Sequence, residues 1–71
     1  MAEASSVQSL DRAFDLLEHL CRSRNGMTIG ALSAETGLHK STVHRLLATM
    51  CMRGYVQHDS ETSIYRPGMR L

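Results

Sequence analysis

The segment Lys40-Ser41-Thr42 brings together three polar side chains that suit contact with a phosphate oxygen or the edge of a base. The lysine supplies a positive charge, the two hydroxyls can bond a phosphate oxygen or a base, and the threonine methyl can touch the methyl group of thymine. Arg45 follows one helical turn after Ser41 and Thr42, and a guanidinium pairs in bidentate fashion with guanine. We therefore expect these residues to contact DNA.

Further candidates lie beside this group and in a later polar segment. His44 and Thr49 flank it on the same predicted helix, where His44 could reach the DNA backbone or pack against a following hairpin. Arg66 is the best candidate of the later segment. Its other polar members could follow a phosphate backbone or a minor groove, or only complete a hairpin; they are Gln57, His58, Ser60 and Thr62. Each residue alone is also compatible with an ordinary solvated surface, but joint placement on the outer N-terminal half of one helix favours DNA.

Residues 7–22 carry apolar side chains at the spacing of an amphipathic helix. The stripe expected to face inward follows the i, i+3, i+4 rule and consists of Val7, Leu10, Ala13, Phe14, Leu17, Leu20 and Cys21. Leu16 lies well off this stripe. The turn dipeptide Asn25-Gly26 predicts that the helix ends within residues 23–26.

A second, shorter helix and a third helix are predicted next. Thr28 is expected to cap the start of the second helix and Gly37 to end it in a left-handed conformation. The third helix is expected from about residue 40 to residue 53, with an inner arc formed by Val43, Leu46, Leu47 and Met50. Two helices joined by a tight turn, the second with a polar outer side, are typical of a helix-turn-helix unit.

Two short β-prone runs, residues 55–58 and 64–66, follow the third helix and flank a polar turn. This arrangement predicts a β-hairpin. Pro67 cannot donate to a strand ladder, so the second strand is expected at a sheet edge. The predicted fold class is mainly α with a small β-hairpin: a winged helix-turn-helix, which is a three-helix bundle plus a wing.

The length and composition exclude several other classes of protein. The chain has 71 residues, which is room for one small domain with a single core. No apolar run approaches the ~18 residues needed to cross a bilayer and no signal peptide opens the chain, so we expect a cytoplasmic protein. Cys21 and Cys51 lack metal-ligand spacing and are expected as buried, reduced thiols. We expect no metal, no cofactor and no enzymatic activity.

The charge is divided unevenly along the chain. Residues 1–36 carry three arginines and five acidic residues, a net charge of 3 − 5 = −2, whereas residues 37–71 carry five basic and two acidic residues, a net charge of 5 − 2 = +3. An acidic half beside a basic half is what a nucleic-acid binder with one working face would show, although scatter among few charges would give the same split.

Four segments, in order and at matching spacing, resemble the N-terminal DNA-binding domain of the IclR family of bacterial transcription regulators. They are residues 6–13 (SVQSLDRA), 36–47 (TGLHKSTVHRLL), 53–56 (RGYV) and 65–68 (YRPG). The DNA-contacting positions of the family correspond to Lys40, Ser41, Thr42 and Arg45. His39 departs from the family pattern, in which proline or serine is usual. The departure puts the helix N-cap in doubt and could add a pH-sensitive phosphate contact, so we include His39 in the DNA-binding set.

The resemblance implies sequence-specific regulation of transcription by a homodimer that binds a palindromic operator in double-stranded DNA. It also implies a separate C-terminal domain that binds a small-molecule effector. We expect residues 1–6 to be a flexible tail, 7–68 the DNA-binding domain, and 69–71 the start of an inter-domain linker helix, with the effector domain absent. The implied dimer gives Leu16 a possible role against a partner chain, with an isolated exposed leucine as the default alternative.

One alternative from another functional class stays open. A winged-helix module can use the same face to bind a protein instead of DNA. The basic second half of the chain and Arg45 favour DNA, whereas the low total charge of +1 keeps the protein-binding alternative open.

Overall fold

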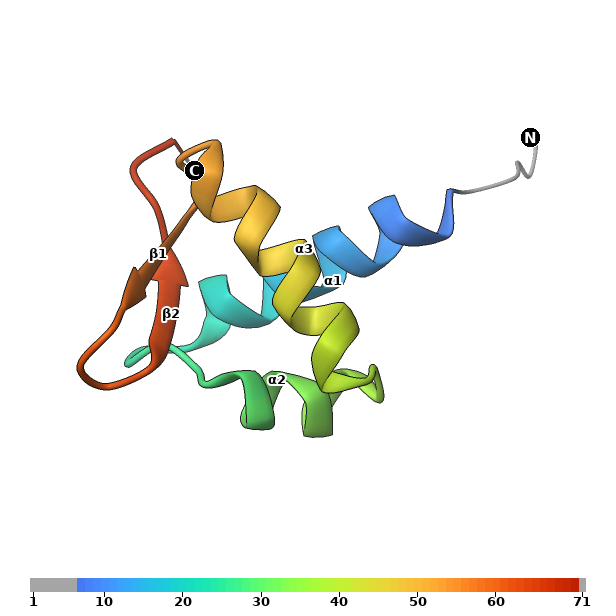
Figure 1. Cartoon of the computed structure of the whole chain (residues 1–71), viewed down its shortest axis with the longest axis horizontal. Helices are drawn as coiled ribbons and strands as arrows, with labels where there is room; N and C mark the ends of the chain where they lie inside the picture. The colour runs from blue at the N-terminus through green and yellow to red at the C-terminus, as the bar shows by residue number, and fades with distance from the viewer. Residues whose placement is uncertain (1–6, 71) are drawn as a thin grey trace.

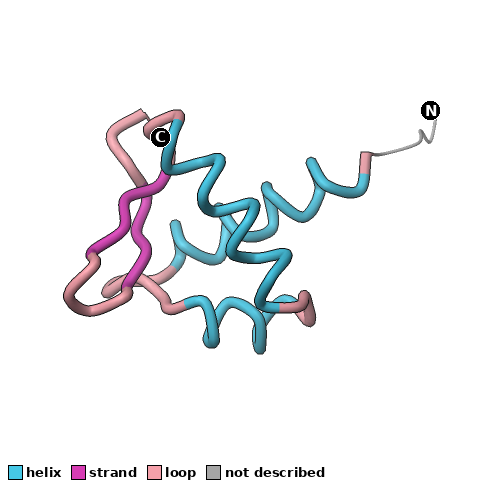
Figure 2. Tube along the Cα trace, viewed as in Figure 1, coloured by secondary structure: helices cyan, strands magenta, loops and turns pink. Residues whose placement is uncertain are grey.

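The structure is a computed structural model that describes residues 7–70, and it consists of three helices followed by a two-stranded antiparallel hairpin (Figures 1 and 2). The elements are α1 (Gln8–Arg22), α2 (Ile29–Thr36), α3 (Lys40–Met52), β1 (Val56–Asp59) and β2 (Ile64–Pro67). The winged helix-turn-helix prediction is confirmed. The tail predicted over residues 1–6 lies outside the described residues. Met69 and Arg70 form a turn and Leu71 is not described, so the linker helix stays a prediction.

The ends of α2 follow the local signals in the sequence. The Thr28 hydroxyl accepts a hydrogen bond from the Ala31 N–H at 3.1 Å, which caps the first turn of α2. Gly37 ends the helix in the left-handed region with φ +77°, and its N–H donates to the Ser33 carbonyl at 2.9 Å. At the start of α3 the His39 side chain makes no capping hydrogen bond with any described residue, consistent with the weak cap expected there.

The hairpin pairs Val56 with Pro67 and His58 with Tyr65, and its two strands lie beside the end of α1 and the C-terminal half of α3. The His58 ring stacks on the Tyr65 ring with a centroid distance of 4.2 Å. On its other side Tyr65 exchanges two backbone hydrogen bonds with Met27, at 2.8 and 3.0 Å. The prediction that the second strand is an edge is confirmed, because β1 and β2 form a two-stranded sheet; the isolated bridge to Met27 flanks β2 at Tyr65, and Pro67 lies beyond it.

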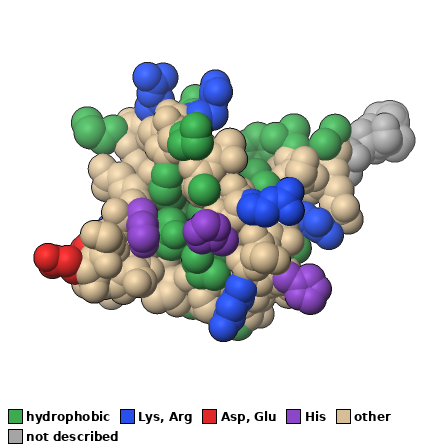
Figure 3. Space-filling view, viewed as in Figure 1, with side chains coloured by type: hydrophobic (Ala, Val, Ile, Leu, Met, Phe, Trp, Pro, Cys, Tyr) green, Lys and Arg blue, Asp and Glu red, His purple; other side chains and the backbone are tan. Residues whose placement is uncertain are grey.

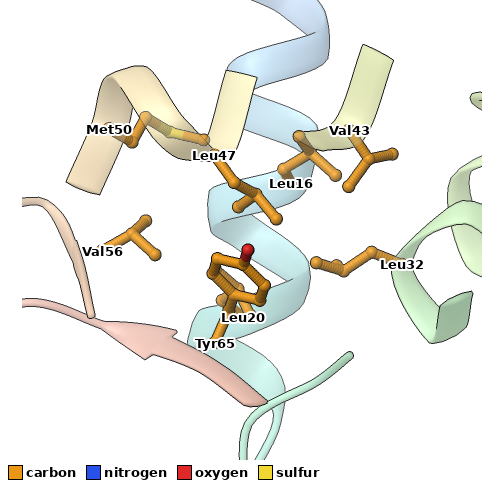
Figure 4. Close-up of a cluster of buried hydrophobic side chains, with 8 residues drawn as sticks. All are labelled: Leu16, Leu20, Leu32, Val43, Leu47, Met50, Val56 and Tyr65. Carbon is orange, nitrogen blue, oxygen red and sulfur yellow. The ribbon is translucent and has the colours of Figure 1, made fainter. Parts of the chain in front are cut away.

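A single core holds the five elements together (Figure 4). Its buried side chains come from every helix and both strands: Leu16, Leu20, Leu32, Val43, Leu47, Met50, Val56 and Tyr65. The inner arc predicted for the third helix is confirmed, because Val43, Leu47 and Met50 are buried and Leu46 packs against them. Burial of these side chains fixes the orientation of α3 relative to the rest of the domain.

The prediction for the buried face of the first helix is confirmed for Leu20, with Ala13 and Leu17 packed against the core, and is wrong for Val7, Leu10 and Phe14. Leu16 and Leu20 are fully buried, whereas Val7, Leu10 and Phe14 are 63%, 53% and 53% exposed. The apolar arc of α1, which runs from Leu16 round to Val7, spans about half the helix circumference at 100° per residue. One small core covers only one edge of so wide an arc, and it covers the edge at Leu16 and Leu20. The proposed role of Leu16 in a dimer interface is thereby excluded.

The two cysteines differ in exposure. Cys21 is exposed, which corrects its expected burial, whereas Cys51 is half-buried and burial raises the pKa of its thiol. Both thiols are free. Among the described residues, no helix has the length and apolar character needed to cross a membrane.

Candidate nucleic-acid interface

The outer side of α3 presents the polar residues that the sequence singled out. Lys40, Ser41, His44, Arg45 and Thr49 are exposed. Thr42 is half-buried between this surface and the core, and the Thr49 hydroxyl donates to the Arg45 carbonyl at 3.2 Å. Figure 3 shows this face, where lysine, arginine and histidine side chains gather over α3 and toward the hairpin. The basic surface is therefore mounted on a helix whose opposite side is held in the core.

The turn between α2 and α3 is fixed by side-chain hydrogen bonds. The Thr36 hydroxyl donates to the Leu32 carbonyl at 2.7 Å and accepts from the Leu38 N–H at 3.3 Å. The Ser33 hydroxyl donates to the Leu38 carbonyl, so the backbone just before α3 is tied to α2 twice. This bracing sets the position of the first turn of α3, where Lys40, Ser41 and Thr42 lie.

The structure adds residues of α1 to this surface that the sequence analysis missed. Ser9 and Arg12 of α1 line a small depression of about 120 Å³ together with Thr42 and Arg45 of α3. Two guanidinium groups thus border one depression beside the outer side of α3. The signal was the position of Arg12 one turn before Leu16: once Leu16 faces the core, Arg12 turns toward α3.

A second, wider depression of about 450 Å³ lies between α3 and the hairpin. Lys40 and His44 border it on α3, His58 borders it on β1, and the first residues of α2 close a third side. The register places His58 on the same face of the hairpin as Tyr65 and Val56, which is the face toward the core. His58 was only one of several polar wing candidates in the sequence, and its face becomes evident once the register is known.

Arg66, the preferred wing residue in the sequence analysis, points elsewhere. It pairs with Gln57 in the hairpin, and alternation places both on the sheet face opposite His58 and Tyr65. Arg66 is exposed there and lies close enough to Asp59 to favour its ionised form. A hydrogen bond from the Glu61 N–H to Asp59, with Thr62 and Arg66 nearby, holds the pKa of Asp59 below its usual range. The structure thus separates Arg66 and Gln57 from His58 and from the predicted contacts on α3.

The described residues contain no cluster of metal-ligating side chains. Within residues 7–70, no three His, Cys, Asp or Glu side chains are placed to share a metal ion. His19 Nδ1 lies 2.8 Å from the Asp15 carbonyl oxygen of its own helix, and His19 does not line the depression that His44 and His58 border. The chemistry concentrated on α3 is that of charge and hydrogen bonding, which suits recognition of a polyanion.

Comparison with known proteins agrees with this geometry. Residues 9–60 match the family model of the IclR helix-turn-helix domain. The chain is 37% identical over 65 residues to the HTH-type transcriptional regulator XynR of Escherichia coli, covering 92% of this chain and 26% of that protein. It is 42% identical over 55 residues to the transcriptional repressor IclR of Escherichia coli, covering 78% and 20%. The chain thus spans about a quarter of the length of the curated relatives it matches.

Solved structures give the same answer for the fold. The IclR-type transcriptional regulator from Alicyclobacillus acidocaldarius superposes with a TM-score of 0.89 at 25% identity, over 93% of this chain and 27% of that one. The Agobacterium tumefaciens repressor BlcR superposes with a TM-score of 0.80 at 27% identity, over 94% and 27%. The chain therefore belongs to the IclR family of transcriptional regulators, and residues 9–60 form its helix-turn-helix DNA-binding domain.

Proposed function

We propose that this domain reads a specific DNA sequence by placing the N-terminal half of α3 in the major groove. The observation that carries the proposal is the exposed row of Lys40, Ser41 and Arg45 on a helix whose other side is buried in the core. Lys40 and Ser41 bind phosphate groups near the start of α3, where the helix dipole favours an anion. Arg45 donates to the edge of guanine and supplies sequence discrimination.

The residues beside this row extend the contact along the DNA backbone. Arg12 reaches a phosphate group next to the base that Arg45 contacts, because both side chains border one depression. The hairpin acts as the wing and approaches the neighbouring backbone with its turn, residues 60–63. His39 and Thr49 lie at the two ends of the contact surface of α3 and contribute to binding of the flanking phosphates.

The domain also pairs with a second copy of itself, so that two copies occupy the halves of a palindromic operator. The support is the apolar edge at the start and along α1, where Val7, Leu10, Phe14 and Cys21 are exposed and Leu17 is half-buried; the five follow each other at alternating spacings of three and four residues. This spacing is that of a helix–helix seam. A groove of about 360 Å³ beside it is lined by apolar residues of α1, Met50 of α3 and Tyr55. In a two-fold dimer both copies use the same patch, so the projecting side chains of one copy can fill the groove of the other.

Pairing through this edge is compatible with DNA binding. Arg12 lies on the other flank of α1, toward Thr42 and Arg45, so a partner on the Leu10 and Phe14 side leaves the DNA-binding surface uncovered. A regulator of bacterial genes works on DNA in the cytoplasm, and we assign the domain no catalytic role. Control by a small-molecule effector, which the family resemblance implies, is not assigned to any residue of 7–70.

The direct test is binding to a fluorescein-labelled duplex of mixed sequence, followed by anisotropy at increasing salt. For non-specific binding by a surface with several cations, the logarithm of the affinity falls linearly with the logarithm of the salt concentration between about 50 and about 200 mM. The proposal predicts binding at the low end of this range and release at the high end. A chain that binds no duplex at about 50 mM salt would contradict the proposed function.

A further inference from the structure

The depression between α3 and the hairpin has the chemistry of an anion site. Lys40 and His44 stand one turn apart on α3, and His58 faces them from β1 across an open space of about 450 Å³. None of the described residues that line the space is acidic. Three nitrogen-bearing side chains from two separate elements therefore border one depression without a carboxylate among them.

The first turn of α2 adds backbone donors on the third side. Thr28 caps the Ala31 N–H, and the N–H groups of Ile29 and Gly30 donate to no described residue. The first N–H groups of a helix point outward and favour an anion. A Cβ at Gly30 would have Thr28 Oγ1 as its nearest neighbour at 3.9 Å, so no described side chain packs closely on Gly30.

The two acidic residues of the hairpin, Asp59 and Glu61, do not line the depression. Asp59 follows His58 in β1 but alternates to the opposite sheet face, where it accepts from the Glu61 N–H at 3.0 Å and lies near Arg66. Glu61 is exposed in the hairpin turn. On the near face, His58 meets Tyr65, whose ring stacks on it at 4.2 Å and fixes the orientation of the imidazole.

We propose that this depression binds a backbone phosphate of the DNA and that protonation of His44 and His58 strengthens the contact. The inference rests on the proposed function, because the depression opens beside the outer side of α3 and would meet the strand next to the major groove. A lysine ammonium is ordinarily charged at neutral pH, whereas imidazole changes charge between about pH 5 and pH 8. DNA binding would therefore take up protons, and affinity would rise as the pH falls.

The test compares the affinity for one duplex at about pH 6 and about pH 8, at constant low ionic strength. The protein is the chain as it stands, and three variants are measured beside it. His44→Gln removes one titratable ring. His58→Phe removes the other while keeping an aromatic ring against Tyr65. Lys40→Gln removes a charge that is present at both pH values.

The expected result is tighter binding at the lower pH, with each histidine contributing up to about fivefold, the upper end of the range for exposed ion pairs. His44→Gln and His58→Phe should each reduce the pH effect, and the double variant should reduce it further. Lys40→Gln should weaken binding at both pH values and leave their ratio unchanged. Thermal unfolding of each variant at both pH values separates these effects from loss of the fold.

The outcomes distinguish this inference from the function on which it rests. The ratio of the affinity at the lower pH to that at the higher pH is the deciding quantity. If this ratio is the same in the double variant as in the unaltered chain, the proton-linked phosphate site is overturned and DNA binding is left intact. Absence of binding at both pH values would contradict the proposed function itself. His39→Gln is measured as well, because His39 is exposed at the start of α3 and outside the depression. A pH effect that is lost in His39→Gln alone would also overturn the assignment.

Discussion

Arg12 and Arg45 border the same depression although one belongs to α1 and the other to α3. Leu16 and Leu20 hold α1 against the core, and this rotation turns Arg12, one helical turn before Leu16, toward the outer side of α3. The helix-turn-helix surface therefore extends beyond the unit formed by α2 and α3. The N-terminal helix serves both to complete the core and to supply a cation beside the residue expected to read the base sequence.

Replacement of Arg12 tests this extension. Arg12→Ala should weaken binding to all duplexes by a similar factor and reduce the slope of log affinity against log salt by about one, because one phosphate contact is lost. Arg22→Ala, which removes the same charge from the exposed C-terminal end of α1, is the matched control and should leave the slope unchanged. Equal slopes for both variants and the unaltered chain would place Arg12 outside the interface.

Substitutions of Lys40 and of Arg45 should have different effects on DNA binding: one on overall affinity, the other on sequence discrimination. Arg45→Ala should lower the discrimination between preferred and unrelated duplexes by about 1–3 kcal/mol, because a bidentate contact with a base edge is removed. Lys40→Ala should weaken all duplexes alike, because a lysine on phosphate carries no sequence information. Competition experiments with a selected and a scrambled duplex give both quantities. Equal loss on every duplex in Arg45→Ala would remove that residue from direct readout.

The buried edge of α1 makes a prediction about stability. Leu16→Ala should lower the free energy of unfolding by about 2–5 kcal/mol, because a fully buried side chain leaves a cavity in the core. Leu10→Ala, the same replacement at a 53% exposed position of the same helix, should cost less than about 1 kcal/mol. Urea unfolding followed by circular dichroism gives both values, and the reverse order would contradict the orientation of α1.

The exposed edge of α1 makes a prediction about assembly. Sedimentation equilibrium of the chain should show a monomer–dimer equilibrium, and Phe14→Glu should shift it to monomer by placing a charge in the apolar seam. Gln57→Glu adds the same charge at an exposed hairpin position and should leave the equilibrium unchanged. The proposed interface would be refuted if Phe14→Glu dimerised as well as the unaltered chain, or if that chain stayed monomeric at millimolar concentration.

The elements of the fold could be predicted from local signals. Thr28 and Gly37 marked the ends of α2 because a cap and a left-handed glycine act within one turn of the backbone. The inner arc of α3 was also evident, because that helix has a narrow apolar arc beside a polar side. The rotation of α1 was not predictable in the same way. Its apolar arc is wide enough for two surfaces, and only packing against α3 and the hairpin decides which edge is buried.

The residues of the candidate site also divide into those that local sequence predicts and those that only tertiary structure brings in. Lys40, Ser41 and Arg45 were found from the sequence because their exposure depends on one helix alone. Arg12 and His58 became part of the surface only through tertiary structure: the first through the rotation of α1, the second through the register of the hairpin. Arg66 is the preferred wing residue on the basis of its charge, yet alternation along β2 places it on the sheet face opposite His58.

The central claim is that the outer side of α3 is the DNA-binding surface, and an amide NMR titration of the chain with duplex DNA of mixed sequence at low salt tests it most directly. The account predicts shifts concentrated in residues 39–49, in the hairpin around His58, and at Arg12, with the exposed edge of α1 around Phe14 unchanged. Shifts confined to other surfaces, with α3 silent, would contradict the claim that this helix reads DNA.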